Sequence, residues 1–136
     1  MDNLAIHLAL HGVMVLTVSV VGGLLLYRSI LRGTNQADWH LLHAGGSARG
    51  ILLIALAGII ALVDLRSWQM AIAVWFVIYF AWTSTLAMLI RAYSRETGFR
   101  FAGSKTNRVG YVLYASGASV LFPGLLLLAV GLFPAL

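Results

Sequence analysis

SWQMAIAVWFVIYFAWTSTLAMLI, residues 67–90, contains no Asp, Glu, Lys or Arg. The apolar core of a bilayer is about 30 Å thick and is crossed by about 20 apolar helical residues, so this stretch is long enough to span a membrane. Residues 3–27 and 109–136 are equally free of charged side chains. Three transmembrane helices are therefore predicted from uncharged length alone.

The composition of the 136 residues agrees with a membrane environment. Hydrophobic residues make up 61% and charged residues 10% of the chain, and the mean hydropathy is +0.94. About a quarter of the residues of a typical soluble domain are charged. The net charge of +5 lies between the apolar stretches, which argues against a nucleic-acid-binding surface. The absence of Cys excludes disulfides and thiolate ligands to metal or haem.

A fourth apolar stretch, residues 50–63, is too short to cross unless its helix begins near residue 41 and includes Arg49. The distribution of basic residues indicates that it does cross. With four spans, one side of the membrane carries seven basic loop residues and the other carries Arg66 alone, as the positive-inside rule expects. The seven are Arg28, Arg32, Arg91, Arg95, Arg100, Lys105 and Arg108. With three spans, four basic residues would face five.

We therefore expect an all-α bundle of four transmembrane helices in a single domain, residues 1–136. The helices are predicted at roughly residues 4–31, 41–63, 67–92 and 108–133. A bacterial-type inner membrane is the expected location, with the basic loops inside and both termini outside. The lipid bilayer is the expected partner.

The segment HAGGSARG, residues 43–50, holds the strongest candidate for a cofactor site. On a helix, Gly46, Ser47 and Gly50 share a face with His43. Small residues beside a histidine leave space for a flat haem with the imidazole as axial iron ligand, and a nearby Arg can bind a haem propionate. The predicted cofactor-binding residues are His43, Gly46, Ser47, Arg49 and Gly50, with His43 as the metal ligand. The alternative interpretation is helix packing, since Gly46 and Gly50 also form a GxxxG motif.

Other polar residues of the predicted helices have weaker signals. Arg49 lies about 9 Å deeper than His43 at 1.5 Å per residue, and a cation at that depth costs at least a few kcal/mol, so we expect an anion such as a propionate as its partner. His40 is the alternative haem ligand. His7 and His11 have the i, i+4 spacing of a metal chelate, although packing is the expected role of His7.

Trp75, Tyr79 and Trp82 predict an aromatic stripe along the third helix, with hydroxyl residues 83–85 beside it. Such a surface is typical of a site for an apolar small molecule, and equally of ordinary helix packing. Pro123 predicts a kink in the fourth helix. All four carboxylates are predicted near the membrane ends, which argues against acid–base catalysis by carboxylates inside the bilayer.

Together these motifs resemble the styrene oxide isomerase family, small four-helix membrane proteins that bind haem b and convert an aryl epoxide to an aldehyde. The resemblance begins at His11-Gly12 and continues through residues 43–50, which are similar to the family's H-x-G-x-x-x-N-G. Residues 82–85, Trp-Thr-Ser-Thr, are similar to the family's W-S-N-T. The match is completed by Gly98, Phe101, Asn107 and Gly110 and spans nearly the whole chain.

The resemblance implies a homotrimer with haem b near the subunit boundaries, His43 as axial ligand and ferric iron as a Lewis acid toward an epoxide. It also implies a substrate pocket, lined by Phe80, Trp82, Thr85 and Met88. At three pocket positions the chain departs from the family, because Arg49 replaces an Asn, Phe80 an Asp and Met88 a Tyr. Three functions stay open: an epoxide isomerase, a haem sensor or electron carrier without turnover, and an accessory subunit without a cofactor.

Overall fold

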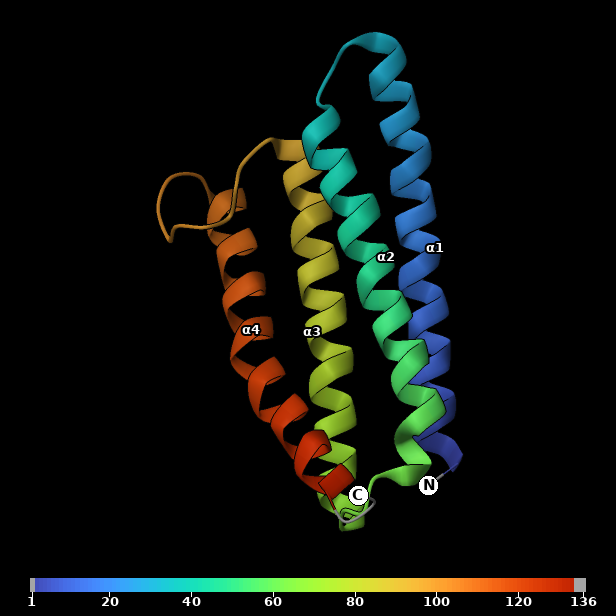
Figure 1. The fold of residues 1–136 in the computed structure, drawn as a ribbon. Coiled ribbons are helices and arrows are strands. Elements are labelled where there is room, and N and C mark those ends of the chain that lie inside the picture. The colour runs from blue at the N-terminus through green and yellow to red at the C-terminus, as the bar shows by residue number, and fades with distance from the viewer. Residues whose placement is uncertain (1, 134–136) are drawn as a thin grey trace.

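The computed structural model describes residues 2–133, without the side chain of residue 2, and this part of the chain is entirely helical apart from its loops (Figure 1). Its four long helices are α1 (Asp2–Arg32), α2 (Gln36–Ile59), α3 (Ser67–Ser94) and α4 (Lys105–Leu132). A 3-10 turn, η1 (Ile60–Leu62), continues α2. Each long helix has the length and hydropathy to cross a membrane, which confirms the predicted fold class. Residues 1 and 134–136 of the predicted domain lie outside the described part.

The helix bounds differ most from the predicted ones at the start of α2. This helix begins at Gln36 instead of near residue 41, because a polar first turn precedes the apolar stretch. Asp38 in that turn favours the helix N-terminus electrostatically and forms an ion pair of 2.6 Å with Arg91 of α3. The helix then continues through Arg49, as crossing the membrane requires. At Pro123, where we expect a kink, α4 remains a continuous helix.

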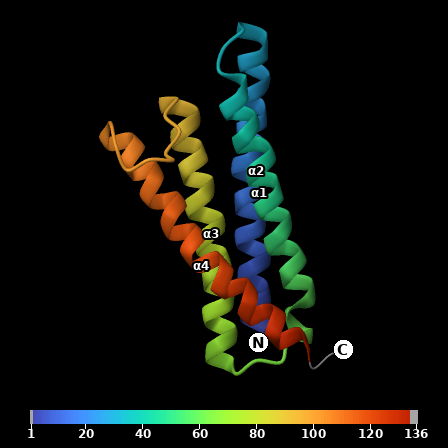
Figure 2. The same ribbon diagram turned by 60° about the vertical axis from the view of Figure 1, so that its left-hand side comes forward.

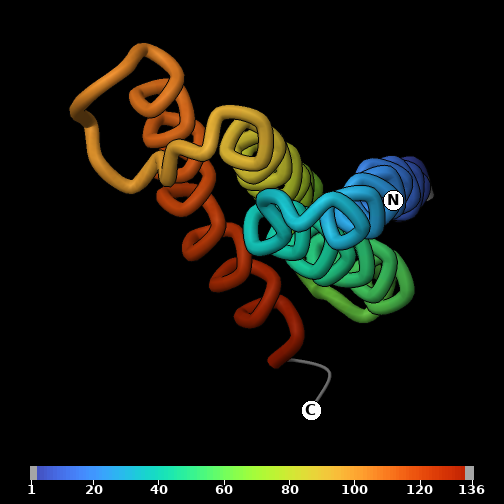
Figure 3. Tube along the Cα trace, turned by 90° about the horizontal axis from the view of Figure 1, so that it is seen from above, coloured from blue at the N-terminus to red at the C-terminus, as the bar shows by residue number. Residues whose placement is uncertain are grey.

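The four helices pack as two antiparallel hairpins (Figure 1). One hairpin is α1 with α2, the other is α3 with α4, and the two meet mainly where α2 lies along α3. Seen from above, α1 and α4 lie on opposite sides of the molecule (Figure 3). Figure 2 shows that α4 is inclined away from the first hairpin at the end that carries the α1–α2 and α3–α4 loops. One side of α3 is therefore left open between α1 and α4.

Small residues bring α1 and α2 into backbone contact. A Cβ placed on Gly12 would lie 2.9 Å from the carbonyl oxygen of Gly50, and one on Gly50 would lie 2.8 Å from that of Gly12. Such close approach is typical of membrane helices, whose association depends on packing because lipid supplies no hydrophobic driving force between them. The GxxxG motif of Gly46 and Gly50 therefore packs against α1.

The loop between α3 and α4 is held by the side chain of Asn107. Its oxygen accepts a hydrogen bond of 2.9 Å from the backbone N–H of Gly98, and its amide donates to the carbonyls of Arg100 (2.8 Å) and Ala102 (2.7 Å). Gly98 has a φ of +67°, and a Cβ there would lie 3.1 Å from the carbonyl carbon of Gly110. Gly98, Asn107 and Gly110, three residues of the motif that resembles the family, thus hold this loop in place.

We predict that Gly98→Ala lowers the thermal stability of the detergent-solubilised protein. A left-handed Ala costs roughly 1–2 kcal/mol, and here the methyl group would also press against Gly110. Gly103→Ala is the matched control, since Gly103 also has a positive φ (+76°) but has no atom within 4 Å of the Cβ position. The melting temperature should fall further in Gly98→Ala than in Gly103→Ala. Equal losses would show that the contact with Gly110 contributes nothing.

Candidate functional site

His43 is partly buried and lies on the side of α2 that faces α1. Its Nδ1 is 2.9 Å from the backbone oxygen of Ser19. Because a carbonyl oxygen only accepts, Nδ1 carries the proton, and in the neutral ring Nε2 has a free lone pair. A Cβ on Gly23 would lie 2.9 Å from Nδ1, so a residue without a side chain is needed there for the ring to lie this close. No group in the described part of the chain bonds to Nε2.

The side chain of Ser19 extends this contact into a small polar cluster between α1 and α2. Its hydroxyl, which is fully buried, donates to the backbone oxygen of His43 and lies 2.7 Å from the hydroxyl of Ser47. The cluster fixes both the tautomer and the orientation of the imidazole. Histidines that bind metals usually donate their second N–H to a carbonyl or carboxylate in this way. The geometry therefore fits an imidazole that ligates a metal through Nε2.

The small residues that follow His43 do not border an open space. A Cβ on Gly46 would lie 3.1 Å from the Cβ of Ser19, and one on Gly50 would lie 2.6 Å from the side chain of Leu16. The expectation of an open floor beside the histidine is wrong for the single chain, because α1 fills that space. Contact of Gly46, Ser47 and Gly50 with a cofactor stays a prediction, and in this structure they pack against α1.

Arg49 lies on a different side of α2, toward α3. It follows His43 by six residues, which places the two about 120° apart around the helix axis. Its Nε donates to the hydroxyl of Ser84 (2.5 Å) and its Nη1 to the backbone oxygen of Gly45 (2.6 Å), while the guanidinium carbon is 5.2 Å from the centre of the Phe80 ring. No carboxylate of the described residues pairs with it. Within the chain, a hydroxyl, a carbonyl and an aromatic face take the place of the expected anion.

The three residues at which we expect departures from the family pattern lie together. Besides its contact with Phe80, Arg49 places Nη1 3.9 Å from the sulfur of Met88. Both partners belong to the side of α3 that faces α2. An aromatic ring and a thioether thus lie beside the cation.

The predicted substrate pocket is divided between different sides of α3. Phe80 and Met88 face Arg49, whereas the indole of Trp82 points toward α1 and His11. Thr85 is fully buried, and its hydroxyl has no hydrogen-bond partner among the described residues. The structure therefore does not bring these residues together into one cavity.

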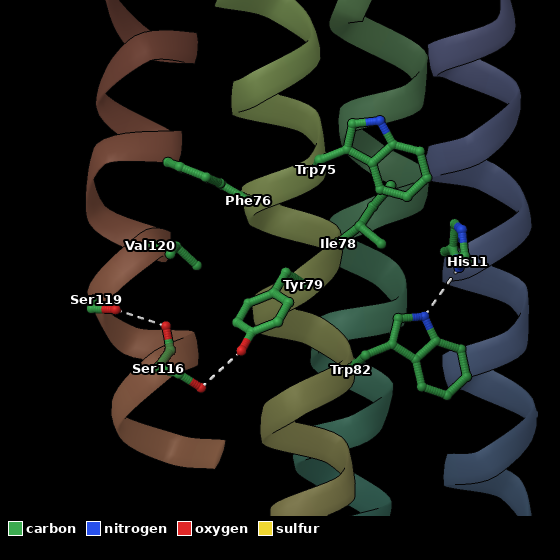
Figure 4. Close-up of a pocket in the computed structure, with 9 residues that line it drawn as sticks. All are labelled: His11, Trp75, Phe76, Ile78, Tyr79, Trp82, Ser116, Ser119 and Val120. Carbon is green, nitrogen blue, oxygen red and sulfur yellow. Dashed lines mark hydrogen bonds between the residues drawn. The ribbon is translucent and has the colours of Figure 1, made fainter. Parts of the chain in front are cut away.

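A cleft of about 610 Å³ opens on the free side of α3, between α1 and α4 (Figure 4). The predicted aromatic stripe of Trp75, Tyr79 and Trp82 forms its wall. Besides Tyr79, the hydroxyl groups of the cleft come from Ser116 and Ser119 of α4, whereas the predicted hydroxyl residues 83–85 do not line it. The remaining lining residues are His11, Phe76, Ile78 and Val120.

The cleft contains a histidine whose role the sequence leaves open. The indole Nε1 of Trp82 donates to Nδ1 of His11 at 3.1 Å, as Figure 4 shows. The His11 ring also lies edge-on to Trp75, with 5.9 Å between ring centres. Nothing in the spacing of these residues along the chain signals the contact, since it joins positions 71 residues apart.

These features define a class: a small multi-pass membrane protein with a histidine fixed in orientation at a contact between two helices. The model of the styrene oxide isomerase family matches residues 4–133, and the chain belongs to that family. This match confirms the resemblance inferred from the motifs. A comparison with curated proteins finds no match to the chain.

Proposed function

We propose that this protein binds haem b with Nε2 of His43 as axial ligand of the iron. The observation that carries the proposal is the hydrogen bond from Nδ1 to the backbone oxygen of Ser19, which leaves Nε2 free and the ring fixed. Membership of the styrene oxide isomerase family supports it. Ferric haem, when bound, supplies a Lewis-acid iron toward an epoxide oxygen.

The packing of α1 restricts where the cofactor binds. Because Gly23 and Ser19 occupy the Nδ1 side of the ring, the haem belongs on the Nε2 side, beyond the α1–α2 hairpin. The homotrimer implied by the family would then enclose the cofactor with a second subunit.

The purified protein is expected to show a Soret absorption band that His43→Ala removes. His40→Ala is the matched control, because His40 is exposed, lies three residues earlier and makes no contact in this cluster. A third variant, Gly23→Val, keeps the ligand but displaces its ring, and should weaken haem binding by roughly tenfold or more. Circular dichroism and size-exclusion chromatography establish that each variant is folded.

Two outcomes of that experiment would contradict the assignment. A full Soret band in His43→Ala would exclude His43 as the ligand. Loss of the band in His40→Ala alone would identify His40 instead.

Epoxide isomerisation, we propose, is altered or lost in this member of the family. Ferric haem would supply a Lewis acid to an epoxide, and the fixed positive charge of Arg49 would oppose any positive charge that develops on a substrate bound nearby. Phe80 and Met88 supply no group that can donate a proton or bear a negative charge. A haem protein that senses a ligand or carries electrons without turnover would keep the His43 site unchanged.

An aldehyde assay with an aryl epoxide tests this proposal. The wild-type protein should give little product per haem, and the triple variant Arg49→Asn, Phe80→Asp, Met88→Tyr should give on the order of tenfold more at equal Soret absorbance. Arg49→Asn alone separates the effect of charge from that of shape. High turnover by the wild type would refute the proposal. Haem binding with no product from either form favours the sensor or electron carrier.

A cofactor-free accessory subunit is the second candidate function. The contact between Gly12 and Gly50 and the bond from Arg49 to the carbonyl of Gly45 are those of simple helix packing. A protein that stays colourless when purified from cells supplied with haem would establish this alternative.

We also propose an orientation in the membrane, in which the loops after α1 and α3 face the cytoplasm of a bacterial cell. Because the chain has no Cys, single introduced cysteines report the side of each loop without background labelling. In intact spheroplasts an impermeant maleimide should label Asp64→Cys but not Ala102→Cys, and it should label both after lysis. Both residues are exposed, and the reverse pattern would invert the topology.

A further inference from the structure

The cleft between α1, α3 and α4 is separate from the His43 site. His11 precedes Ser19 by eight residues on α1, which places it about 12 Å farther along the helix axis. The cleft also lies on the other side of α3 from the contacts of Arg49 with Phe80 and Ser84. The proposed haem function therefore leaves this cleft unexplained.

The size and walls of the cleft suit a flat apolar molecule. Its volume of about 610 Å³ lies within the roughly 300–1,000 Å³ typical of small-molecule sites. Trp75 and Tyr79 are 45% and 46% exposed, although they lie in the middle of a transmembrane helix. No Asp, Glu, Lys or Arg lines the cleft, so a neutral ligand that partitions into the bilayer is favoured.

Hydrogen-bond accounting leaves two side-chain donors of this cleft without an acceptor among the described residues, the indole N–H of Trp75 and one N–H of His11. The hydroxyl of Tyr79 donates to Ser116 (3.1 Å), and those of Ser116 and Ser119 lie 3.3 and 2.8 Å from the backbone oxygens of Leu113 and Ser116. An indole N–H is a donor only, so the Nδ1 of His11 that binds Trp82 must be the acceptor. The proton of the neutral imidazole is therefore on Nε2.

Within the described part of the chain, no acceptor meets that Nε2–H. An N–H group in apolar surroundings without an acceptor is costly, since it has lost its bonds to water. A ligand that brings one acceptor oxygen next to the imidazole would remove this cost. The surrounding aromatic rings would pack on the apolar body of the same ligand.

We propose that this cleft binds a neutral, lipid-soluble aromatic compound with one acceptor oxygen, which receives a hydrogen bond from Nε2–H of His11. The aromatic stripe of α3 packs against the ring of the ligand. The ligand enters from the bilayer, because the cleft opens where α1 and α4 lie apart (Figure 4). This site needs neither haem nor His43.

Two matched probes test the site in lipid nanodiscs: 2-acetylnaphthalene, which has an acceptor oxygen, and naphthalene, which has none. Binding is followed by quenching of the fluorescence of Trp75 and Trp82. The wild type should bind the ketone more tightly. His11→Phe keeps an aromatic ring but removes the donor, so it should weaken ketone binding by roughly tenfold and leave naphthalene binding nearly unchanged.

Further variants separate this site from folding defects and from haem. Ser119→Phe places a ring in the cleft and should abolish binding of both probes, whereas Ala118→Phe, on the neighbouring exposed residue that does not line the cleft, should not. His43→Ala should bind the ketone as the wild type does, which makes the result independent of the proposed cofactor.

Several outcomes would overturn the proposal. Equal affinity of the wild type for the two probes, or an unchanged ketone affinity in His11→Phe, would exclude the hydrogen bond. Absence of quenching, together with a smaller oligomer in Ser119→Phe, would show that a second copy of the chain fills the cleft. Quenching that Ser119→Phe leaves intact would place the probe elsewhere in the protein or the lipid.

Discussion

Backbone contact between α1 and α2 is the interaction on which the rest of the molecule depends. Gly12 and Gly50 approach so closely that neither has room for a methyl group. The same approach, continued along the helices, brings the carbonyl of Ser19 to 2.9 Å from His43 and the imidazole against Gly23. A wider separation would leave Nδ1 unpaired and the ring free to rotate. In lipid, the packing of these glycines therefore determines how the imidazole of His43, the proposed iron ligand, is oriented.

Arg49 shows how a membrane helix accommodates a cation without a counter-ion of its own. The guanidinium has a hydroxyl and a carbonyl as acceptors, and Phe80 presents its ring face to the remaining charge. The cation at position 49 thus occurs together with neighbours that accommodate it.

The sequence predicts the fold well because contact with lipid directly determines the length of the stretches without charged residues and the placement of basic residues between them. It also identifies His43 as a candidate and the aromatic stripe of α3. It does not predict that α1 covers Gly46 and Gly50, because a surface of small residues serves a cofactor and a neighbouring helix equally well. The partners of Arg49 and His11 depend on how each helix is rotated about its axis, which only the packing of all four helices determines.

The division into two hairpins has a consequence for how the protein is made. Every contact that orients His43 lies within α1 and α2, so this half can reach its final arrangement in the bilayer before the ribosome has completed α3. The second half then docks along α2, where the ion pair between Asp38 and Arg91 and the bond from Asn35 to the carbonyl of Ala92 join the halves near the loop end. The contacts that orient His43 therefore do not require the second hairpin to be in place.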